Sequence, residues 1–175
     1  MNDLPQLASL IKSRNTIDSK IATLIGQPAQ VQTVGEYIAA LIFGIALDET
    51  SAHKSSDGRF TRDLLAGHTV DVQWHIRHDG ILHLKTDPFP DYYLVFVGSK
   101  EATSLHTLSI PWVIESVFLF EAGELLTALR ERGVQVGKGT SITGPLWERA
   151  EIYPVQRNSR LMLTSEERTT IGLFR

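Results

Sequence analysis

The stretch "TVDVQWHI", residues 69–76, has the alternating pattern of a β-strand. Neighbouring side chains of a strand point to opposite faces, so the stretch has one apolar and one polar face. The apolar face carries Val70, Val72, Trp74 and Ile76. The polar face carries Asp71, Gln73 and His75. An acid and an amide two residues apart serve either solubility or chemistry, and the rest of the chain must distinguish the two.

The composition is that of a single soluble globular domain. The chain has 175 residues, of which 42% are hydrophobic and 21% charged, which is enough apolar material for a substantial core. It has no cysteine, which excludes disulfides, thiolate catalysis and zinc–cysteine sites. The formal net charge of −3 gives no overall attraction to nucleic acid, so such binding must rest on a local basic surface.

The N-terminal sequence predicts neither export nor membrane insertion. "MNDLPQLASLIKSRN" places an acid and a lysine where a signal peptide needs an uninterrupted apolar run. No window approaches the roughly 18 consecutive apolar residues of a membrane span. We therefore expect a cytoplasmic protein with no membrane partner.

Helical spacing of apolar residues dominates the first quarter of the chain. Residues 4–25 predict one long helix, or two with a break near Asn15, ended by Gly26 and Pro28. A second helix is expected from near Thr33. It is apolar nearly all round and should be buried.

The middle of the chain predicts strands. A polar loop over residues 48–63 and a short strand lead into strands at about 69–77 and 80–86. The sequence "HDG" between these two strands favours a hairpin. Residues 92–98, "YYLVFVG", are apolar on both faces and suit a central strand. A further strand is expected at 112–120.

The last third of the chain returns to helical patterns. Residues 121–133 predict a helix that ends at Gly133, and 134–137 a short strand. Residues 144–153 predict a short helix with Pro145 in its first turn. Thr164 and Glu167 form a capping-box pattern for a last helix. These elements predict an α/β or α+β fold with a single central mixed sheet, built from a helical segment 1–30, a core 33–120 and a C-terminal part 121–175.

Carboxylates occur in an order that suits metal-dependent phosphodiester cleavage. Such chemistry activates a water and neutralises phosphate charge, and Mg²⁺ held by oxygen ligands does both. Glu36 lies in the predicted buried helix, Asp57 in the polar loop, and Asp71 and Gln73 on the strand. Only residues i and i+2 of a strand point the same way, so the last two side chains can serve one site.

Four segments, three of which contain these residues, resemble the restriction-endonuclease-like superfamily, the PD-(D/E)XK nucleases. They are "IGQPAQVQTVGEYIAALIFGIAL" (25–47), "AHKSSDGRF" (52–60), "LAGHTVDVQWHI" (65–76) and "DYYLVFVG" (91–98). More narrowly, the chain resembles an uncharacterised bacterial family that shares "PWVIESVFLF", "RGVQVG" and "WERAEIYP". The resemblance implies a restriction-endonuclease-like fold and a metal-dependent endonuclease. The implied substrate is DNA, in restriction or genome defence. Mg²⁺ is the implied cofactor, with Mn²⁺ as an alternative.

The resemblance also assigns roles residue by residue. Glu36 matches the glutamate that the superfamily has on a helix, and Asp71 matches the (D/E) position of the motif. Asp57 matches the first aspartate of the motif, although no proline precedes it here. Asp57 and Asp71 are thereby implied metal ligands. Gln73 stands where the pattern has lysine; an amide can orient water but cannot supply positive charge. Lys85, on the neighbouring strand, is a candidate for the missing charge, and Lys54 in the loop is a weaker one.

The only marked basic density lies between residues 53 and 85. We expect phosphate contacts there from Lys54, Arg59, Arg62, His75, Arg77 and Lys85. Five of the six histidines also lie in this region, which raises a zinc site as an alternative. His75 and His83 could meet across the predicted hairpin, although a polar surface explains the histidines more simply. A homodimer is left open.

Each functional assignment has a structural alternative. Thr33 and Glu36 fit a capping box, which needs no chemistry. Asp57 precedes Gly58 in a common turn pair. Trp74, Trp112 and Trp147 are better read as core residues than as base-stacking ones. At the level of the protein, the alternatives are a catalytically inactive nuclease-fold module that binds nucleic acid or protein, or an interaction protein unrelated to nucleic acid.

Overall fold

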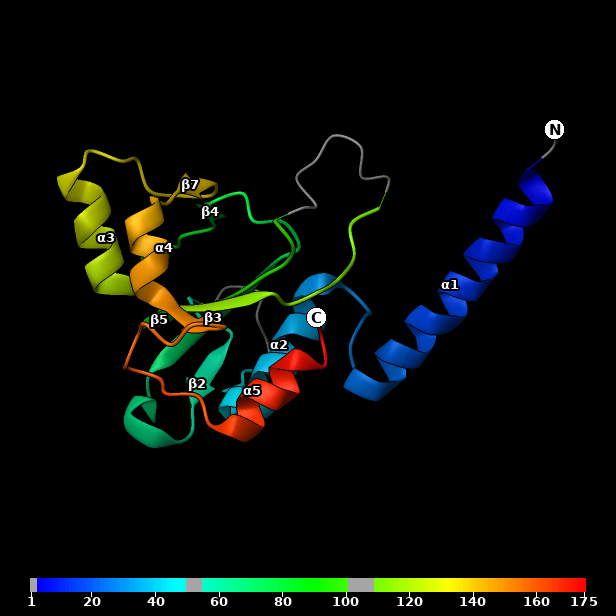
Figure 1. The fold of residues 1–175 in the computed structure, drawn as a ribbon, viewed down its shortest axis with the longest axis horizontal. Helices are drawn as coiled ribbons and strands as arrows, with labels where there is room; N and C mark the ends of the chain where they lie inside the picture. The colour runs from blue at the N-terminus through cyan, green and yellow to red at the C-terminus, as the bar shows by residue number, and fades with distance from the viewer. Residues whose placement is uncertain (1–2, 50–54, 101–108) are drawn as a thin grey trace.

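A six-stranded mixed sheet forms the centre of the computed structural model, which describes residues 3–49, 55–100 and 109–175 (Figure 1). Its strands, in spatial order, are β1 (Ile45–Leu47), β2 (Gly58–Phe60), β3 (Thr69–His75), β5 (Tyr92–Val97), β6 (Ser116–Glu121) and β8 (Glu151–Tyr153). Only the β3–β5 pair is parallel; the other neighbours are antiparallel. The predicted mixed α/β architecture is confirmed.

The two parallel strands form the middle of this sheet. Their register runs from Val70 opposite Tyr92 to His75 opposite Val97. Every residue of β5 is buried, which confirms the predicted central strand and explains its apolar composition on both faces.

Helices cover both faces of the sheet (Figure 1). One face packs Val72, Trp74 and Phe96 against α2 (Val31–Phe43) and α5 (Ser165–Gly172). The other face packs apolar side chains such as Val95 against α3 (Ala122–Glu131) and α4 (Gly144–Ala150). Asp71 and Gln73 point to this second face, because they alternate with the core residues of β3.

The predicted hairpin at "HDG" is wrong. The turn itself forms, with Gly80 at φ +74° and Asp79 Oδ1 accepting from the amide of Ile81 at 3.0 Å. However, β5 pairs along one edge of β3, β2 pairs with Thr69 and Val70 on the other, and the described residues after the turn do not join this sheet. The predicted strand 80–86 shrinks to β4 (Ile81–Leu82), which pairs with β7 (Thr140–Ser141) in a separate two-stranded sheet.

The predicted capping box at Thr33 and Glu36 is also wrong. Helix α2 begins at Val31, and the residue that caps it is Gln30. The Thr33 hydroxyl accepts from the Gln30 amide at 3.3 Å. Glu36 lies one turn further into the helix, so its carboxylate is not used in capping.

Several boundaries in the second half of the chain differ from the sequence expectation. The strand predicted at 112–120 covers 116–121, and residues 134–137 form no strand. The helix predicted for 144–153 ends at Ala150, because the next three residues pair with β6 as strand β8. The capping box of Thr164 and Glu167 at the start of α5 is confirmed.

The three tryptophans do not behave alike. Trp74 and Trp147 are buried as predicted, and the Trp74 indole N–H donates to the carbonyl of Val113 at 3.2 Å. The prediction that Trp112 is a core residue is wrong, because 39% of it is exposed at the edge of this core. Its ring lies against that of Trp74.

The first helix, α1 (Leu4–Ile25), is continuous through Asn15 and extends away from the sheet and its covering helices (Figure 1). None of its residues is buried. Among the described residues, no helix is long and apolar enough to cross a membrane.

Candidate functional site

A polar cavity of about 820 Å³ opens between α2, the start of β2, β3 and the segment 83–88. All four predicted catalytic side chains line it: Glu36, Asp57, Asp71 and Gln73. They come from three elements that are far apart in sequence, and the sheet pairing of β2 with β3 brings them together. The four residues that the sequence analysis selected therefore lie together in one cavity.

Asp57 enters this cavity from the turn before β2. Its Oδ2 accepts a hydrogen bond of 2.7 Å from the backbone amide of Val72, which fixes its carboxylate beside Asp71. Burial, followed by the negative charges of Asp71 and Glu36, raises the pKa of Asp57 from 3.8 to about 7. The cavity thus holds more negative charge than its surroundings compensate.

Glu36 reaches the same cavity from the second turn of α2. Its carboxylate accepts from Gln32 Nε2 at 2.8 Å, and that amide nitrogen also donates to the carbonyl of Val72 at 2.5 Å. The pKa of Glu36 is raised, mainly by burial and further by the charge of Asp71. Glu36 therefore belongs to the carboxylate group, with Gln32 joining α2 to β3.

Asp71 lies at the centre of the group, with only 5% of its surface exposed. One carboxylate oxygen, Oδ1, forms an ion pair with the ammonium of Lys85. The other, Oδ2, accepts from Gln73 Nε2 at 2.9 Å. A buried carboxylate requires such partners, and here Lys85 supplies the positive charge that the strand position 73 lacks.

Gln73 holds the segment after β4 through both ends of its amide. Its Nε2 also donates to the carbonyl of His83 at 2.7 Å, and its Oε1 accepts from the amide of His83 at 3.2 Å. His75 Nε2 lies 3.0 Å from the same Oε1. These contacts leave little of the Gln73 amide for a water or a phosphate. Its observed role is to fix the segment that carries Lys85.

His75 and His83 are brought together, as one alternative expected, but not through a hairpin. Their rings stack with centroids 5.6 Å apart, and His83 Nδ1 accepts from the amide of Gly139 at 3.3 Å. Burial lowers the pKa of His75, which favours the neutral ring at pH 7. Within the described residues, no three His, Cys, Asp or Glu side chains are arranged to hold a metal ion, so the zinc alternative gains no support.

The residues predicted to contact nucleic acid are divided between different parts of the surface. Of those that the structure describes, His75 and Lys85 alone line the cavity. Arg59 donates to the carbonyl of Gly67 at 3.0 Å, and Arg77 is exposed beyond the end of β3. The remaining two are Arg62, whose guanidinium pairs with Glu167 at 2.6 Å, and Lys54, which lies outside the described residues.

The cavity also has polar lining residues that sequence reasoning did not assign to the site, among them Lys138 and Gln32. Lys138 reaches it from the turn before β7, and Gln32 reaches it from the first turn of α2. The signal for Lys138 was the "GKG" within "GVQVGKGTS", which the sequence alone identifies only as a turn. Gln32 follows from its spacing, because residues i and i+4 of a helix share a face with Glu36.

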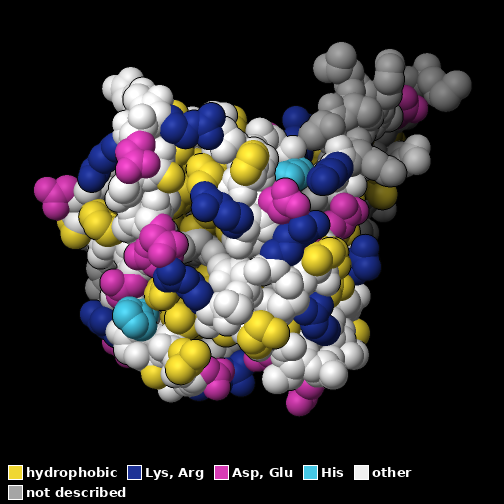
Figure 2. All heavy atoms as spheres, turned by 60° about the vertical axis from the view of Figure 1, so that its left-hand side comes forward, with side chains coloured by type: hydrophobic (Ala, Val, Ile, Leu, Met, Phe, Trp, Pro, Cys, Tyr) yellow, Lys and Arg dark blue, Asp and Glu magenta, His cyan; other side chains and the backbone are white. Residues whose placement is uncertain are grey.

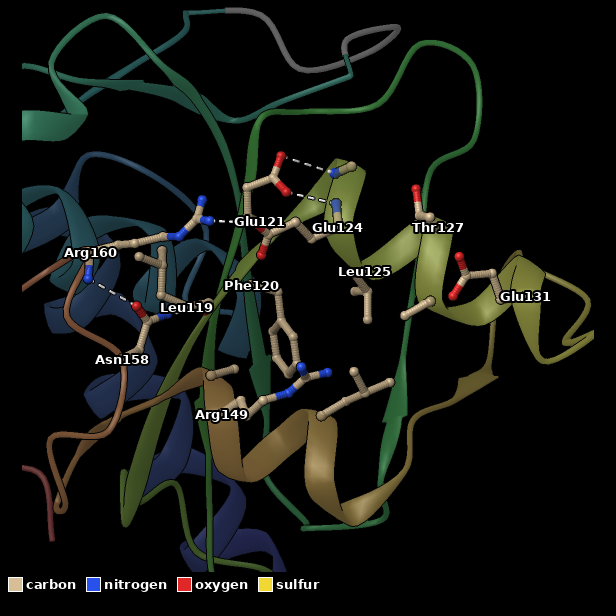
Figure 3. Close-up of a pocket in the computed structure, with 14 residues that line it drawn as sticks. Leu119, Phe120, Glu121, Glu124, Leu125, Thr127, Glu131, Arg149, Asn158 and Arg160 are labelled. Carbon is tan, nitrogen blue, oxygen red and sulfur yellow. Dashed lines mark hydrogen bonds and ion pairs between the residues drawn. The ribbon is translucent and has the colours of Figure 1, made fainter.

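A second cavity, of about 740 Å³, lies between α3, α4 and the segment 158–160 (Figure 3). The two carboxylate oxygens of Glu121 accept hydrogen bonds from the amides of Gly123 and Glu124 at the start of α3. Arg160 forms an ion pair with Glu124. On the face shown in Figure 2, basic and acidic side chains are interspersed and neither sign forms a continuous patch. None of the predicted catalytic residues lines this cavity.

Neither a scan against models of protein families nor a search of curated proteins finds a match for this chain. A functional proposal therefore rests on the geometry of the carboxylate cavity.

Proposed function

We propose that this protein is a Mg²⁺-dependent endonuclease that hydrolyses phosphodiester bonds in DNA, in the setting of restriction or genome defence. One observation carries the proposal. Glu36, Asp57 and Asp71 share a cavity with Lys85, and burial together with the charges of the other two carboxylates raises the pKa of Asp57 to about 7. Strongly perturbed carboxylates in a cleft are typical of sites that bind a cation or move a proton.

The donor set of this cavity fits Mg²⁺. Carboxylate oxygens are its preferred protein ligands, and the ion commonly takes one or two of them together with waters and substrate phosphates. Asp57 and Asp71 would hold it, so a cage of three protein ligands is not required. When bound, Mg²⁺ supplies a water of lowered pKa and neutralises phosphate charge. Mn²⁺ suits the same oxygen ligands.

The remaining side chains supply the protein's own part of the chemistry. The ammonium of Lys85 can donate to a phosphate oxygen from its position beside Asp71. Glu36, with its raised pKa, is suited to accept a proton from the attacking water near neutral pH. Lys138, at the rim of the cavity, can hold an adjacent phosphate.

The proposal is tested by cleavage of supercoiled plasmid DNA with MgCl₂, MnCl₂ or EDTA. We expect nicking or linearisation with either metal and none with EDTA. Asp57→Asn and Asp71→Asn should each lower the rate at least 100-fold, because each removes a ligand charge. Glu166→Gln, an exposed acid on α5, is the matched control and should cleave like the wild type.

Two results would contradict the proposal. Cleavage that both aspartate variants retain would come from a contaminating enzyme. Absence of cleavage, with a DNA gel shift that EDTA does not change, would support instead the inactive nuclease-fold module that binds nucleic acid. The complete use of the Gln73 amide in structural hydrogen bonds is the observation that favours this second candidate.

A further inference from the structure

Helix α1 exposes an apolar face that nothing in the described structure covers. Among the described residues, six of the thirteen exposed large hydrophobic side chains belong to this one helix: Leu4, Leu7, Leu10, Ile11, Ile17 and Leu24. Most helical stability in proteins comes from packing an amphipathic face, and exposed apolar patches of this kind mark interaction sites. The helix therefore requires a partner.

The apolar side chains of α1 follow the spacing of a helix that pairs with another helix. Leu7, Leu10, Ile17, Ile21 and Leu24 fall at alternating steps of three and four residues, with Arg14 at the one interrupted position. On the opposite face the hydroxyls bond their own backbone, as Thr16 does to the carbonyl of Lys12 at 3.0 Å. The two faces of α1 thus differ, and only the apolar face exposes a stripe of large hydrophobic side chains that no described residue covers.

We infer that the partner is the α1 helix of a second copy of this chain, packed antiparallel. The argument rests on the charge pair in the middle of the stripe, where Arg14 lies 3.5 Å from Asp18. In a parallel pair, Arg14 would face Arg14 of the other copy, which is repulsive. In an antiparallel pair, Arg14 lies beside Ile17 and Asp18 of the other copy, and the same contact recurs across the two-fold axis.

The antiparallel register also matches apolar residues with one another. Leu7 lies level with Leu24 of the other copy, and Leu10 with its Ile21, so every layer outside the centre is apolar. A helix of 22 residues is about 33 Å long, so the two sheet domains would lie at opposite ends of the pair without clashing. Such a contact is small for a protein interface, and we expect a reversible dimer.

The first test is the mass of the full-length protein in solution. Light scattering across a dilution series from millimolar to micromolar should show a dimer that dissociates on dilution. Ile17→Glu should weaken the dimer at least tenfold, because it places a charge in the apolar stripe. Thr16→Glu, on the opposite face of α1, should dimerise like the wild type. A monomer at every concentration, or equal weakening by both variants, would overturn the inference.

The second test establishes the orientation by cross-linking, because the chain has no natural cysteine. Leu10→Cys and Ile21→Cys proteins should form a disulfide-linked dimer under mild oxidation only when mixed, since the antiparallel pair brings position 10 against position 21. A dimer formed by Leu10→Cys alone would indicate a parallel pair and overturn the orientation. Neither test depends on nuclease activity, so the dimer and the proposed function can fail separately.

Discussion

Asp57 experiences the strongest electrostatic perturbation in the cavity. It combines burial with two neighbouring carboxylates, and among the described residues the hydrogen bond to its carboxylate comes from the backbone of Val72. Gln73 illustrates the opposite situation, because its amide is fully satisfied. At this scale, function is expected where charge is left uncompensated, and structure where hydrogen bonds are complete.

The raised pKa of Asp57 predicts a pH-dependent effect of Asp57→Asn on stability without metal. Below about pH 4 the acid is protonated in both folded and unfolded states and has no effect. Between about pH 4 and 7 the unfolded chain loses this proton first, so stability falls as pH rises. Thermal denaturation in EDTA should therefore show Asp57→Asn melting several degrees above wild type at pH 8 and level with it near pH 4.

Asp91→Asn provides a control of opposite sign for that measurement. Burial raises its pKa, but hydrogen bonds from Thr69 and the neighbouring His68 together bring the pKa of Asp91 below its usual value. A carboxylate of this kind stabilises the folded state above its unfolded pKa. Asp91→Asn should therefore melt below wild type at pH 8. The interpretation fails if Asp57→Asn changes the melting temperature equally at both pH values.

Lys85 is predicted to be the cation on which cleavage depends. Lys85→Met should lower the rate of plasmid cleavage at least 100-fold, because no other cation pairs with Asp71 among the described residues. Lys12→Met, on the exposed face of α1, is the matched control. Adding Gln73→Lys to Lys85→Met should restore part of the rate by placing the charge at the strand position. Wild-type cleavage by Lys85→Met would refute this role.

At the scale of elements, β3 is defined by what occupies its two edges. The pairing of β2 with Thr69 and Val70 carries Asp57 to the cavity, and β5 pairs in parallel along the other edge. The chain after β3 therefore folds over the polar face of the strand, where Gln73 fixes it and Lys85 meets Asp71. The displaced hairpin is thus what completes the site.

Gly58 tests the importance of the β1–β2 pairing for the site. A Cβ at this position would lie 2.3 Å from the carbonyl oxygen of Ala46, so Gly58→Ala must push the strands apart. We expect a loss of about 1–3 kcal/mol in the free energy of unfolding, measured with urea. Gly137→Ala is the matched control, because nothing lies within 4 Å of its added Cβ. Equal stability of the two variants would show that β1 can move away from β2 without a loss of stability.

At the scale of the whole molecule, the two faces of the sheet have separate tasks. One face carries a core built with α2 and α5, against which Val70, Val72 and Trp74 of β3 pack. The other carries both a core under α3 and α4 and the carboxylate cavity. A formal net charge of −3 means that attraction to DNA must be local. We therefore expect substitutions that remove negative charge from this cavity to change both DNA binding and the stability of the fold.

Binding of Mg²⁺ should stabilise the whole fold. A ligand that binds only the folded state adds about 2.7 kcal/mol at 100 times its Kd, which corresponds to a rise of several degrees in the melting temperature. We expect this rise for wild type at pH 7.5, reversed by EDTA, and absent in the Asp57→Asn and Asp71→Asn variants. KCl of equal ionic strength controls for screening. An equal rise in all three proteins would exclude binding at this cavity.

Local patterns predicted those features that depend on neighbouring residues. The alternation of residues 69–76, the apolar run at 92–98 and the Thr164–Glu167 capping box all have the predicted structure. The order of Glu36, Asp57 and Asp71 also identified three residues that share one cavity. Strand alternation and helix capping act within a few residues, so they can be read from the sequence.

Tertiary structure alone decided which strands pair and which side chain supplies the positive charge. The "HDG" turn forms locally, but the pairing of the following β4 with β7 instead of β3 joins segments far apart in sequence, and no local pattern predicts it. The same applies to Lys85 and Lys138, whose positions follow from the folding of their segments over β3. Glu36 was ambiguous for the same reason: only the start of α2 at Val31 frees its carboxylate for the cavity. Sequence thus determined the chemical groups, while long-range packing determined their partners.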